Sequence, residues 1–180
     1  MPHTRKSQLD SWKFLVRLGA SVTPRAIGET FEPTSYTSQF NPETERIAFT
    51  RTELNDRPLG RLTLDTLTVS RSTMVNVNFS RTSLKHAEMR WNRVYDCDFS
   101  RCVMVDADLR GSVYEQCSFK HAILDGADFR FSLFEMCSFL GASMNGVKLT
   151  YEVGDQLNLD SEQRDAIDWQ DADGPVPDMG

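Results

Sequence analysis

The stretch YDCDFSRCVMVDAD, residues 95–108, contains the residue types of a metal or redox site. Cys97 and Cys102 lie among aspartates, and His86 and His121 flank the stretch on either side. Thiolates, imidazoles and carboxylates are ligands for transition metals, and two thiols can form a disulfide. Whether these residues do either depends on which of them the fold brings together.

A five-residue pattern surrounds the stretch. In fives from Leu62, the chain reads LTLDT LTVSR STMVN VNFSR TSLKH AEMRW NRVYD CDFSR CVMVD ADLRG SVYEQ CSFKH AILDG ADFRF SLFEM CSFLG ASMNG VKLTY. The third place of every unit, from Leu64 to Leu149, is apolar, the first is mostly small, and the fourth and fifth are mostly polar. A period of five fits neither an amphipathic helix nor a half-buried strand.

A second period of twenty residues indicates how the chain turns. The units VNFSR, CDFSR, CSFKH and CSFLG begin at residues 77, 97, 117 and 137 and resemble one another more than they resemble their neighbours. Four units per coil predict a square cross-section, with coils about 4.8 Å apart and equivalent residues stacked in columns. Residues 47–151 then form about five coils.

Units such as ADLRG, ADFRF, CDFSR and CSFKH resemble the A(D/N)LXX consensus of the pentapeptide repeat proteins. The resemblance covers residues 62–151 and implies an all-β solenoid, a right-handed quadrilateral β-helix. Residues 47–61 keep the same frame, but Arg57 stands in an inward place next to Pro58. We therefore expect an irregular first coil.

The chain divides into three parts. Residues 1–46 are expected to form an N-terminal helix within 9–20, a cap and a connector, and residues 47–151 the β-helix. Residues 152–180 are expected to form a capping helix and an acidic tail. The second helix is predicted within NLDSEQRDAIDW, residues 158–169, where Asp160 and Gln163 have the spacing of a capping box.

The net charge of −6 is unevenly distributed. Residues 47–151 contain thirteen Lys/Arg and twelve Asp/Glu, whereas residues 152–180 contain one Lys/Arg and nine Asp/Glu. No apolar run approaches the roughly 18 residues of a membrane span, and the N-terminus lacks the apolar core of a secretory signal. With four cysteines, this favours a reducing, cytoplasmic location, and secretion as an effector is the alternative.

The repeat provides a structural role for each residue of the opening stretch. His86 and His121 fall in outward fifth places of different columns. The aspartates of the stretch fill outward second and fifth places, and the family consensus itself has Asp or Asn in the second place. Cys97, Cys117 and Cys137 form one column of inward first places. No nucleophile-elbow or phosphate-loop motif is present. We therefore expect no metal, no cofactor and no enzymatic activity.

The surface offers two kinds of candidate. Arg81, Arg101 and His121 form one outward column, and Arg90, Arg110 and Arg130 form another. Because the repeats are nearly neutral overall and Asp108 and Asp128 accompany the second column, direct nucleic-acid binding is not expected.

Apolar residues in outward places are more informative. A protein-binding patch at one corner is predicted from Trp91, Tyr95, Val113, Phe131, Leu133 and Tyr151. The alternative is that residues 21–46, which include Phe31, Tyr36 and Phe40, pack over this patch. A smaller patch, Val103, Val105 and Ile123, lies on the opposite wall, and Ile167 and Trp169 are the candidates for a homodimer contact through the C-terminal helix.

These features predict a non-catalytic scaffold that binds a protein target. The family includes bacterial proteins that protect DNA gyrase from quinolones or peptide toxins as acidic, DNA-like rods. A near-neutral coil imitates a duplex poorly, since a duplex carries about one charge per 1.7 Å, unless its acidic residues cluster on one face. An immunity or antidote protein and a secreted effector or adaptor remain as alternatives.

Overall fold

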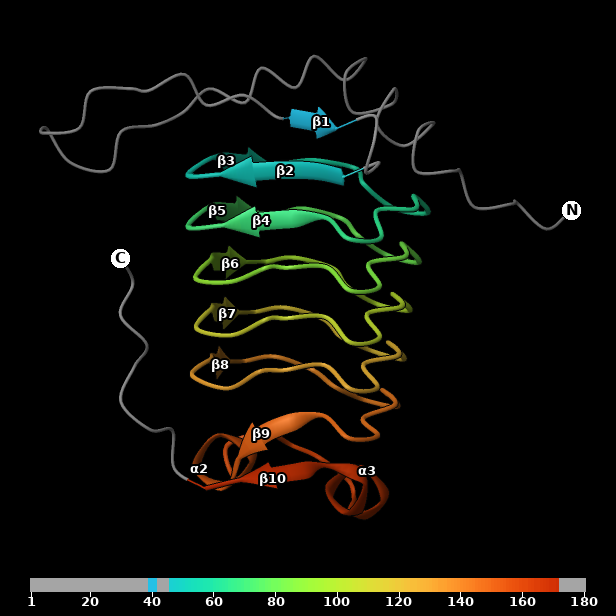
Figure 1. The fold of residues 1–180 in the computed structure, drawn as a ribbon. Helices are drawn as coiled ribbons and strands as arrows, with labels where there is room; N and C mark the ends of the chain where they lie inside the picture. Colours follow the sequence, from blue (N-terminus) through green and yellow to red (C-terminus); the bar gives the residue numbers. More distant parts are fainter. Residues whose placement is uncertain (1–38, 42–45, 172–180) are drawn as a thin grey trace, which may run out of the picture.

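The computed structural model describes residues 39–41 and 46–171, which form a stack of coils with helices at its C-terminal end (Figure 1). Each coil takes twenty residues, because parallel pairing joins residues twenty apart: Glu53 to Thr73, Thr63 to Ser83 and Asp108 to Asp128. The predicted β-solenoid is confirmed. It has about six turns, one more than expected.

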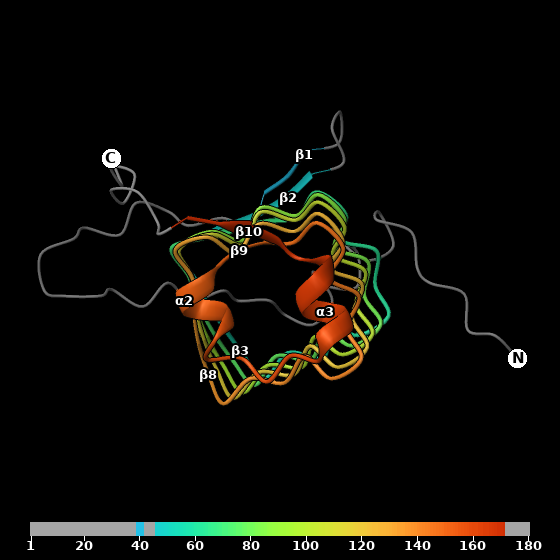
Figure 2. The same ribbon diagram turned by 90° about the horizontal axis from the view of Figure 1, so that it is seen from below.

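The coil has four walls of one five-residue unit each, and seen along its axis it is four-sided (Figure 2). We call them walls A, B, C and D, starting at residues 52, 57, 62 and 67 and at every twentieth residue after these; residues 47–51 also belong to wall D. Each wall ends at a corner, occupied by the fifth place of its unit: AB, BC, CD and DA.

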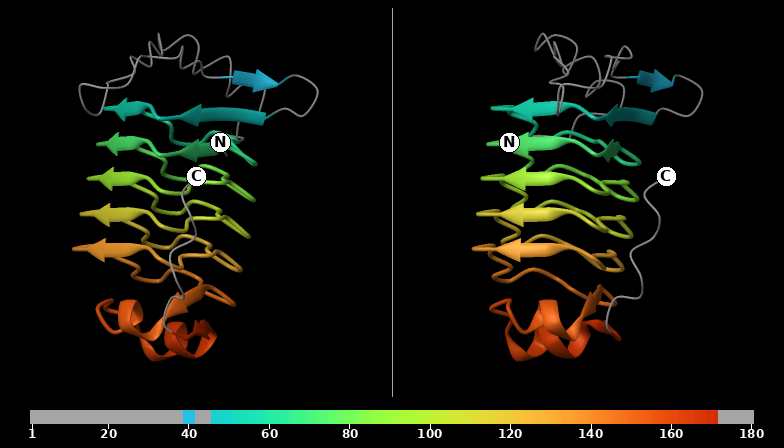
Figure 3. Two further views of the ribbon diagram at one scale, coloured as in Figure 1. Left: turned by 60° about the vertical axis from the view of Figure 1, so that its left-hand side comes forward. Right: turned by 90° about the vertical axis from the view of Figure 1, so that its left-hand side faces the viewer.

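Wall A is the most regular wall. Five short parallel strands stack in it, as the side views show (Figure 3). They are β3 (Glu53–Asn55), β5 (Thr73–Val75), β6 (Arg93–Tyr95), β7 (Val113–Glu115) and β8 (Leu133–Glu135).

Wall D holds β2 (Arg46–Thr50), β4 (Thr68–Ser70) and β9 (Lys148–Thr150), and β1 (Gln39–Asn41) pairs antiparallel with β2 at the first rung. Within wall B and within wall C, successive coils are joined by single bridges, such as Asn78 to Asp98 on wall B and Val103 to Ile123 on wall C.

The fifth place of every unit from Arg51 to Gly146 has a left-handed backbone. The non-glycine residues there have φ between 51° and 63°, a conformation that costs roughly 1–2 kcal/mol for an L-residue. In return, the fifth-place N–H donates to the fourth-place carbonyl of the next coil, as in Trp91 to Arg110 (3.0 Å). This residue turns the chain at each corner.

The interior is filled by third-place side chains. Phe79, Phe99, Phe119 and Phe139 stack nearly parallel, with ring centroids 4.9–5.0 Å apart. On wall A, Tyr114 and Phe134 stack in the same way at 5.1 Å. The rung spacing thus matches the thickness of stacked rings, so the core grows without gaps along the axis.

First-place side chains are small and frequently carry a donor. Ser112 Oγ donates to the Met89 carbonyl (3.0 Å) and Ser132 Oγ to the Leu109 carbonyl (2.9 Å). Thr82 Oγ1 donates in the same way to Leu59 (2.6 Å). Each of these bonds satisfies a buried third-place carbonyl 23 residues earlier, so it ties adjacent coils together.

The expected irregularity of the first coil is confined to one hydrogen bond: the Leu59 N–H donates to the Arg57 carbonyl (3.1 Å), whereas the equivalent Phe79 N–H donates to Asp98 in the next coil. Pro58 pairs with Asn78 in the same arrangement as later coils, and Arg57 is half-buried in its first place. A second-place N–H donates to the preceding coil, as Ser83 does to Leu62. Because Pro58 lies in the first coil, its missing N–H removes no bond between the described coils.

The C-terminal cap keeps the twenty-residue period. The helix α2 (Tyr151–Gly154) lies under wall A and α3 (Ser161–Ala166) under wall C (Figure 2). The strand β10 (Asp168–Gln170) pairs with β9, twenty residues earlier. This extra turn is the reason for the larger number of turns.

The predicted capping box of Asp160 and Gln163 is confirmed. The Gln163 side chain also donates to the carbonyls of Phe139 and Ala142, which fastens α3 to the last coil. The expected N-terminal helix and the acidic tail from residue 172 lie outside the described residues. In the part that the structure describes, no helix is long and apolar enough to cross a membrane.

Wall D carries an ion-pair ladder of alternating sign, formed by Glu88, Arg90, Asp108, Arg110, Asp128 and Arg130. Arg110 reaches Asp108 at 2.7 Å in its own coil and Asp128 at 3.8 Å in the next. Burial acts to raise the pKa of Asp128, but hydrogen bonds from Arg130 outweigh it and lower the pKa. The hydrogen bond to Asp108 raises the pKa of Arg110. The ladder neutralises itself, as the sequence predicted for Asp108 and Asp128.

The lowered pKa of Asp128 leads to a prediction. Its stabilising contribution is present above the unfolded-state value near 3.9 and is lost as the pH falls through the lower folded-state value. Asp128→Asn is expected to cost about 1–2 kcal/mol at pH 7, and the difference from the parent should shrink below pH ~4. Melting temperatures between neutral and acidic pH test this.

The matched control is Asp98→Asn, in the same place on wall B, where the carboxylate accepts from the Ser100 N–H and no arginine ion pair is seen among the described residues. Equal losses in both variants, or a difference that persists in acid, would contradict the ladder's role.

Tyr114 is the exception in the core. Its side chain is fully buried, and its hydroxyl is the one buried side-chain polar atom without a hydrogen-bond partner among the described residues. Burial raises the pKa of this phenol. An unpaired buried hydroxyl is destabilising.

Tyr114→Phe is therefore expected to raise the free energy of unfolding by about 1 kcal/mol. Because the folded state disfavours the phenolate, the parent should also lose stability relative to this variant above pH ~10. Chemical denaturation at neutral and alkaline pH measures both effects. Tyr95→Phe, at a half-buried outward place, is the control, and a destabilised Tyr114→Phe would show that the hydroxyl has a partner.

Candidate protein-binding surface

The cysteines of the opening stretch are part of the core. Cys97 and Cys102 are buried, and no cysteine is in a disulfide. The Cys102 thiol donates to the Phe79 carbonyl (2.8 Å) and the Cys97 thiol to Tyr95 (3.2 Å). Within residues 39–41 and 46–171, no three His, Cys, Asp or Glu side chains are placed to hold a metal ion.

Cys97, Cys117 and Cys137 stack as predicted, on successive coils of wall B. The Cys137 thiol acts to lower the pKa of Cys117, but its contact with Cys97 and its burial outweigh this effect and raise the pKa to about 12. At neutral pH the Cys117 thiol is protonated. Since the thiolate is the form that binds metals and attacks disulfides, this thiol is inert.

The two histidines lie at different corners. His86 is at the CD corner, 3.9 Å from Asp106. His121 is at the BC corner above Gly141, where a Cβ would come within 2.6 Å of its Nδ1. The expectation that they do not converge agrees with this geometry.

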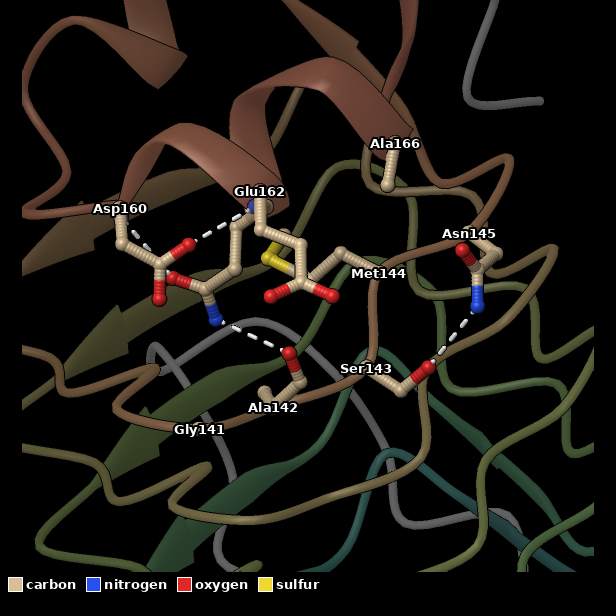
Figure 4. Close-up of a pocket in the computed structure, with 9 residues that line it drawn as sticks. Gly141, Ala142, Ser143, Met144, Asn145, Asp160, Glu162 and Ala166 are labelled. Atoms are coloured by element: carbon tan, nitrogen blue, oxygen red, sulfur yellow. Dashed lines mark hydrogen bonds between the residues drawn. The ribbon is translucent and has the colours of Figure 1, made fainter.

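A pocket of about 270 Å³ lies between α3 and the last coil (Figure 4). Its polar groups are largely bonded to one another: Gln163 to the backbone of Ala142, and Asn145 to Ser143 Oγ (3.0 Å). No nucleophile–base pair lines it. The pocket therefore marks the boundary between the C-terminal cap and the last coil.

The DA corner gathers most of the predicted patch. The Trp91 ring lies over Gly111, at a spot that any Cβ at Gly111 would overlap. Phe131 follows two coils below Trp91, and Tyr151 stacks on Trp169, with ring centroids 4.8 Å apart and planes within 9°. Aromatic rings thus line this edge, and its backbone is held by the corner conformation at Trp91 and Phe131.

Val113 and Leu133 extend this patch onto wall A. They are paired on β7 and β8, and Leu133 is 58% exposed, as is Tyr151 at 56%. Trp91, Val113 and Phe131 are half-buried. We call these five residues the DA patch: Trp91, Val113, Phe131, Leu133 and Tyr151.

Tyr95 lies apart from the DA patch. It occupies a fourth place on wall A, between Val75 and Glu115, on the side of the AB corner. The sequence-based grouping of six residues at one corner therefore becomes five, with Tyr95 across the wall.

The two candidates for a dimer contact close the end of the solenoid. Ile167 is in line with Val147 and is buried, with 7% exposure. Trp169 pairs with Leu149 and its ring packs against Gly154. Both take inward places of the added turn, where Ile167 is buried and Trp169 is half-buried.

Sorting the charges by wall reveals a feature that the sequence analysis missed. Wall A with its corner holds five carboxylates and one arginine, and wall C three carboxylates and one lysine. Wall B holds five Lys/Arg and one carboxylate, and wall D holds six Lys/Arg and three carboxylates. The near-neutral rod is therefore polarised into two acidic walls and two basic walls, in alternation.

Two exposed apolar residues were also missed. Met136, at the AB corner, is 69% exposed and Leu140, on wall B, 64%. Each is the one large apolar member of its column, and the sequence analysis considered only columns that repeat such members. Ile123 of the smaller predicted patch is 41% exposed, and Val103 and Val105 are half-buried.

Comparisons with known proteins agree with this architecture. The family model of pentapeptide repeats matches residues 115–150, in eight copies. No curated protein matches the chain.

Several solved structures are similar. A pentapeptide repeat protein, Rfr23, from the cyanobacterium Cyanothece 51142 is 19% identical, with 54% of this chain and 63% of that chain covered and a TM-score of 0.29. A pentapeptide repeat protein from the Arabidopsis thaliana thylakoid lumen is 21% identical, with 62% of this chain and 71% of that chain covered and a TM-score of 0.28.

Trypsin-treated QnrB1, a plasmid-mediated fluoroquinolone resistance protein, is 14% identical, with 70% of this chain and 72% of that chain covered and a TM-score of 0.34. The match to the cyanobacterial Rfr23 spans less than two thirds of the length of that protein. Residues 115–150 are thus pentapeptide repeats, and the same five-residue units continue through the described coils.

Proposed function

We propose that this protein is a non-catalytic scaffold that binds a protein target through the DA patch. The observation that carries the proposal is a line of apolar side chains on a rigid edge, with Leu133 and Tyr151 more than half exposed. Aromatic and aliphatic groups in such positions are the usual anchors of protein interfaces. The sheet beneath them is already ordered, so binding costs little backbone entropy.

The charges beside the patch define the partner further. Wall A adjoins the DA corner and carries Glu115 and Glu135 next to Val113 and Leu133. A partner with an apolar pocket and a basic rim fits this combination, since complementary charges steer and orient association. On wall D, on the other side, the three carboxylates are already paired with arginines of the ladder.

Protection or neutralisation of the target is the proposed outcome, as for an antidote to a toxin or a topoisomerase-protecting protein. Wall A has the clustered acidity that duplex imitation needs, but its net four charges over roughly 19 Å, four rungs, are sparse beside one per 1.7 Å. The apolar contacts of the DA patch are therefore expected to contribute more to binding than the acidity of wall A. Gyrase supercoiling assays with added protein distinguish the topoisomerase role from the antidote role.

A bacterial cytoplasmic location belongs to the same proposal. The four thiols are free, and those of Cys97, Cys102 and Cys117 are buried, which suits a reducing compartment. Secretion as an effector or adaptor is the alternative, and fractionation of the native host distinguishes the two.

The patch is tested by pairing Phe131→Ser with Leu133→Asp. Loss of both anchors is expected to weaken binding by at least about 30-fold, the cost of a lost interface hot spot, while the melting temperature changes little because both side chains point outward. Partners captured from the host by the parent protein are titrated against each variant by calorimetry.

Ile123→Asp, on the opposite wall C, is the matched control and should bind like the parent. Unchanged affinity of the Phe131/Leu133 variant, or an equal loss in the control, would remove the DA patch as the docking site.

A further inference from the structure

The CD corner of the last coil holds the one Asn-Gly pair of this sequence, Asn145 and Gly146. They occupy the fourth and fifth places of the last unit of wall C, and both are exposed. An asparagine before a glycine can deamidate spontaneously, because glycine has no side chain to keep its backbone nitrogen away from the asparagine amide. At Gly146, no atom lies within 4 Å of the point where a Cβ would stand.

The reaction needs only water as a co-reactant. The Gly146 nitrogen attacks the side-chain carbonyl carbon, Cγ, of Asn145. The new C–N bond closes a succinimide ring, and the amide nitrogen leaves as ammonia with the proton of the Gly146 N–H. Water then opens the ring at either carbonyl, which gives aspartate or isoaspartate. No oxidation or reduction takes place, and an amide has been exchanged for a carboxylate.

In the folded protein, Gly146 is restrained by the C-terminal cap. Its N–H donates to the carbonyl of Ala166 (2.7 Å), the last residue of α3. One coil earlier on the same corner, the Gly126 N–H donates to the Asn145 carbonyl (2.8 Å). The bond at Gly126 therefore depends on a complete coil, whereas the bond at Gly146 depends on a helix of six residues.

The side chain of Asn145 is restrained as well. Its Nδ2 donates to Ser143 Oγ (3.0 Å, Figure 4) and to Asp125 Oδ1 (3.2 Å). Attack by the Gly146 nitrogen requires this side chain to rotate and the bond to Ala166 to open. A short helix at the end of a chain opens at a lower free-energy cost than packed coils do, so opening of α3 controls the rate.

We propose that Asn145 is a deamidation site whose rate is set by docking of α3, and that its conversion loosens the cap in turn. A carboxylate at this position has no N–H to donate to Ser143. It also stands where the amide nitrogen lies 3.2 Å from a carboxylate oxygen of Asp125, and like charges at this distance repel. In the isoaspartyl product the main chain gains a carbon atom, which displaces the Gly146 N–H from Ala166. Both products favour the undocked helix.

Undocking of α3 changes the end of the solenoid. The helix is fastened to the last coil by Gln163, whose side chain donates to the carbonyls of Phe139 and Ala142 (2.8 and 2.9 Å). Without the helix, these carbonyls and the Gly146 N–H face an open rung, the kind of edge to which further β-structure can add. Deamidation thus converts a capped rod into one with an open end. This inference does not depend on the DA patch or on its target.

The rate of conversion is the first measurement. The full chain is incubated at neutral pH and digested with trypsin, and mass spectrometry of peptide 131–148 follows the change from amide to acid. Unfolding in guanidinium chloride should accelerate the reaction at least about tenfold, because the bond to Ala166 is lost. Gly146→Ala should lose most of the conversion. A side chain has room there, and non-glycine residues adopt the same conformation at other corners.

A variant of the helix tests the control by the cap. Gln163→Ala should accelerate conversion at least about tenfold, because two buried hydrogen bonds that hold α3 are lost. Asp165→Ala, at an exposed position of the same helix, is the matched control and should convert at the rate of the parent. Circular-dichroism melts establish that the coils of each variant are folded.

The effect on the cap is measured by amide exchange of Asp168, whose N–H donates to Val147 across the boundary of cap and coil (2.9 Å). Asn145→Asp reproduces one product and should make this amide exchange at least about tenfold faster. Asn76→Asp is the matched control, because Asn76 Nδ2 donates to Asp56 Oδ1 (2.7 Å) at the distant AB corner. It should leave the exchange of Asp168 as in the parent.

Three results would overturn the proposal. If Asn145 stays unconverted in the unfolded chain, there is no deamidation site. If the folded parent converts as fast as the unfolded chain, or Gln163→Ala no faster than Asp165→Ala, the cap does not control the rate. If Asn145→Asp leaves the exchange of Asp168 unchanged, conversion does not loosen the cap.

Discussion

The rest of this structure depends on the hydrogen bond made at each corner. A residue in the left-handed conformation ends every unit, and its N–H donates to the fourth-place carbonyl of the next coil, as His86 does to Val105 at 2.9 Å. The conformation turns the chain, and the bond holds the turn at the height of one rung. Repeated four times, it closes a coil after twenty residues and places equivalent side chains in columns. The strain at each corner is accepted because the bonds and the stacked core recur in every coil.

Column stacking also determines the surface. One place in the repeat can become an apolar edge, as at the DA corner, or a charged edge, as at the BC corner, without any change in the backbone. The same arginine side chain has different roles on two edges: Arg110 is held between Asp108 and Asp128, whereas Arg101 projects from a column of cations. Function in such a rod therefore depends on which corner a residue occupies, and little on which coil.

Much of the fold followed from the periods of five and twenty, because inward places need apolar or small side chains and outward places do not. The capping box at Asp160 and Gln163 was also predictable, since its signal is local. The corner conformation was not, because the arginines and tryptophan at the corners are poor indicators of a left-handed backbone. The sixth turn was missed since α2 and α3 replace two walls there, and the five-residue pattern stops at Tyr151 while the twenty-residue spacing continues to Gln170.

The surface was harder to predict than the core. The apolar columns were visible, yet the separation of Tyr95 from the DA patch required knowing that second and fourth places lie toward different corners. The charge polarity of the walls was hidden by their nearly equal totals. Burial of Ile167 and half-burial of Trp169 depend on the added turn, which places them in line with Val147 and Leu149.

The most direct test of this account is amide hydrogen exchange, measured residue by residue by NMR across residues 62–150. On walls B and C, second-, third- and fifth-place amides donate to neighbouring coils, whereas a fourth-place amide such as that of Ser100 donates to a side chain. On wall A, the fourth places lie within the paired strands β5, β6, β7 and β8. The account predicts that the fourth-place amide of each unit on walls B and C exchanges fastest, while the fourth-place amides of wall A are protected. Fourth-place amides of walls B and C protected as strongly as the third-place ones, or protection with a period of two or 3.6, would contradict it.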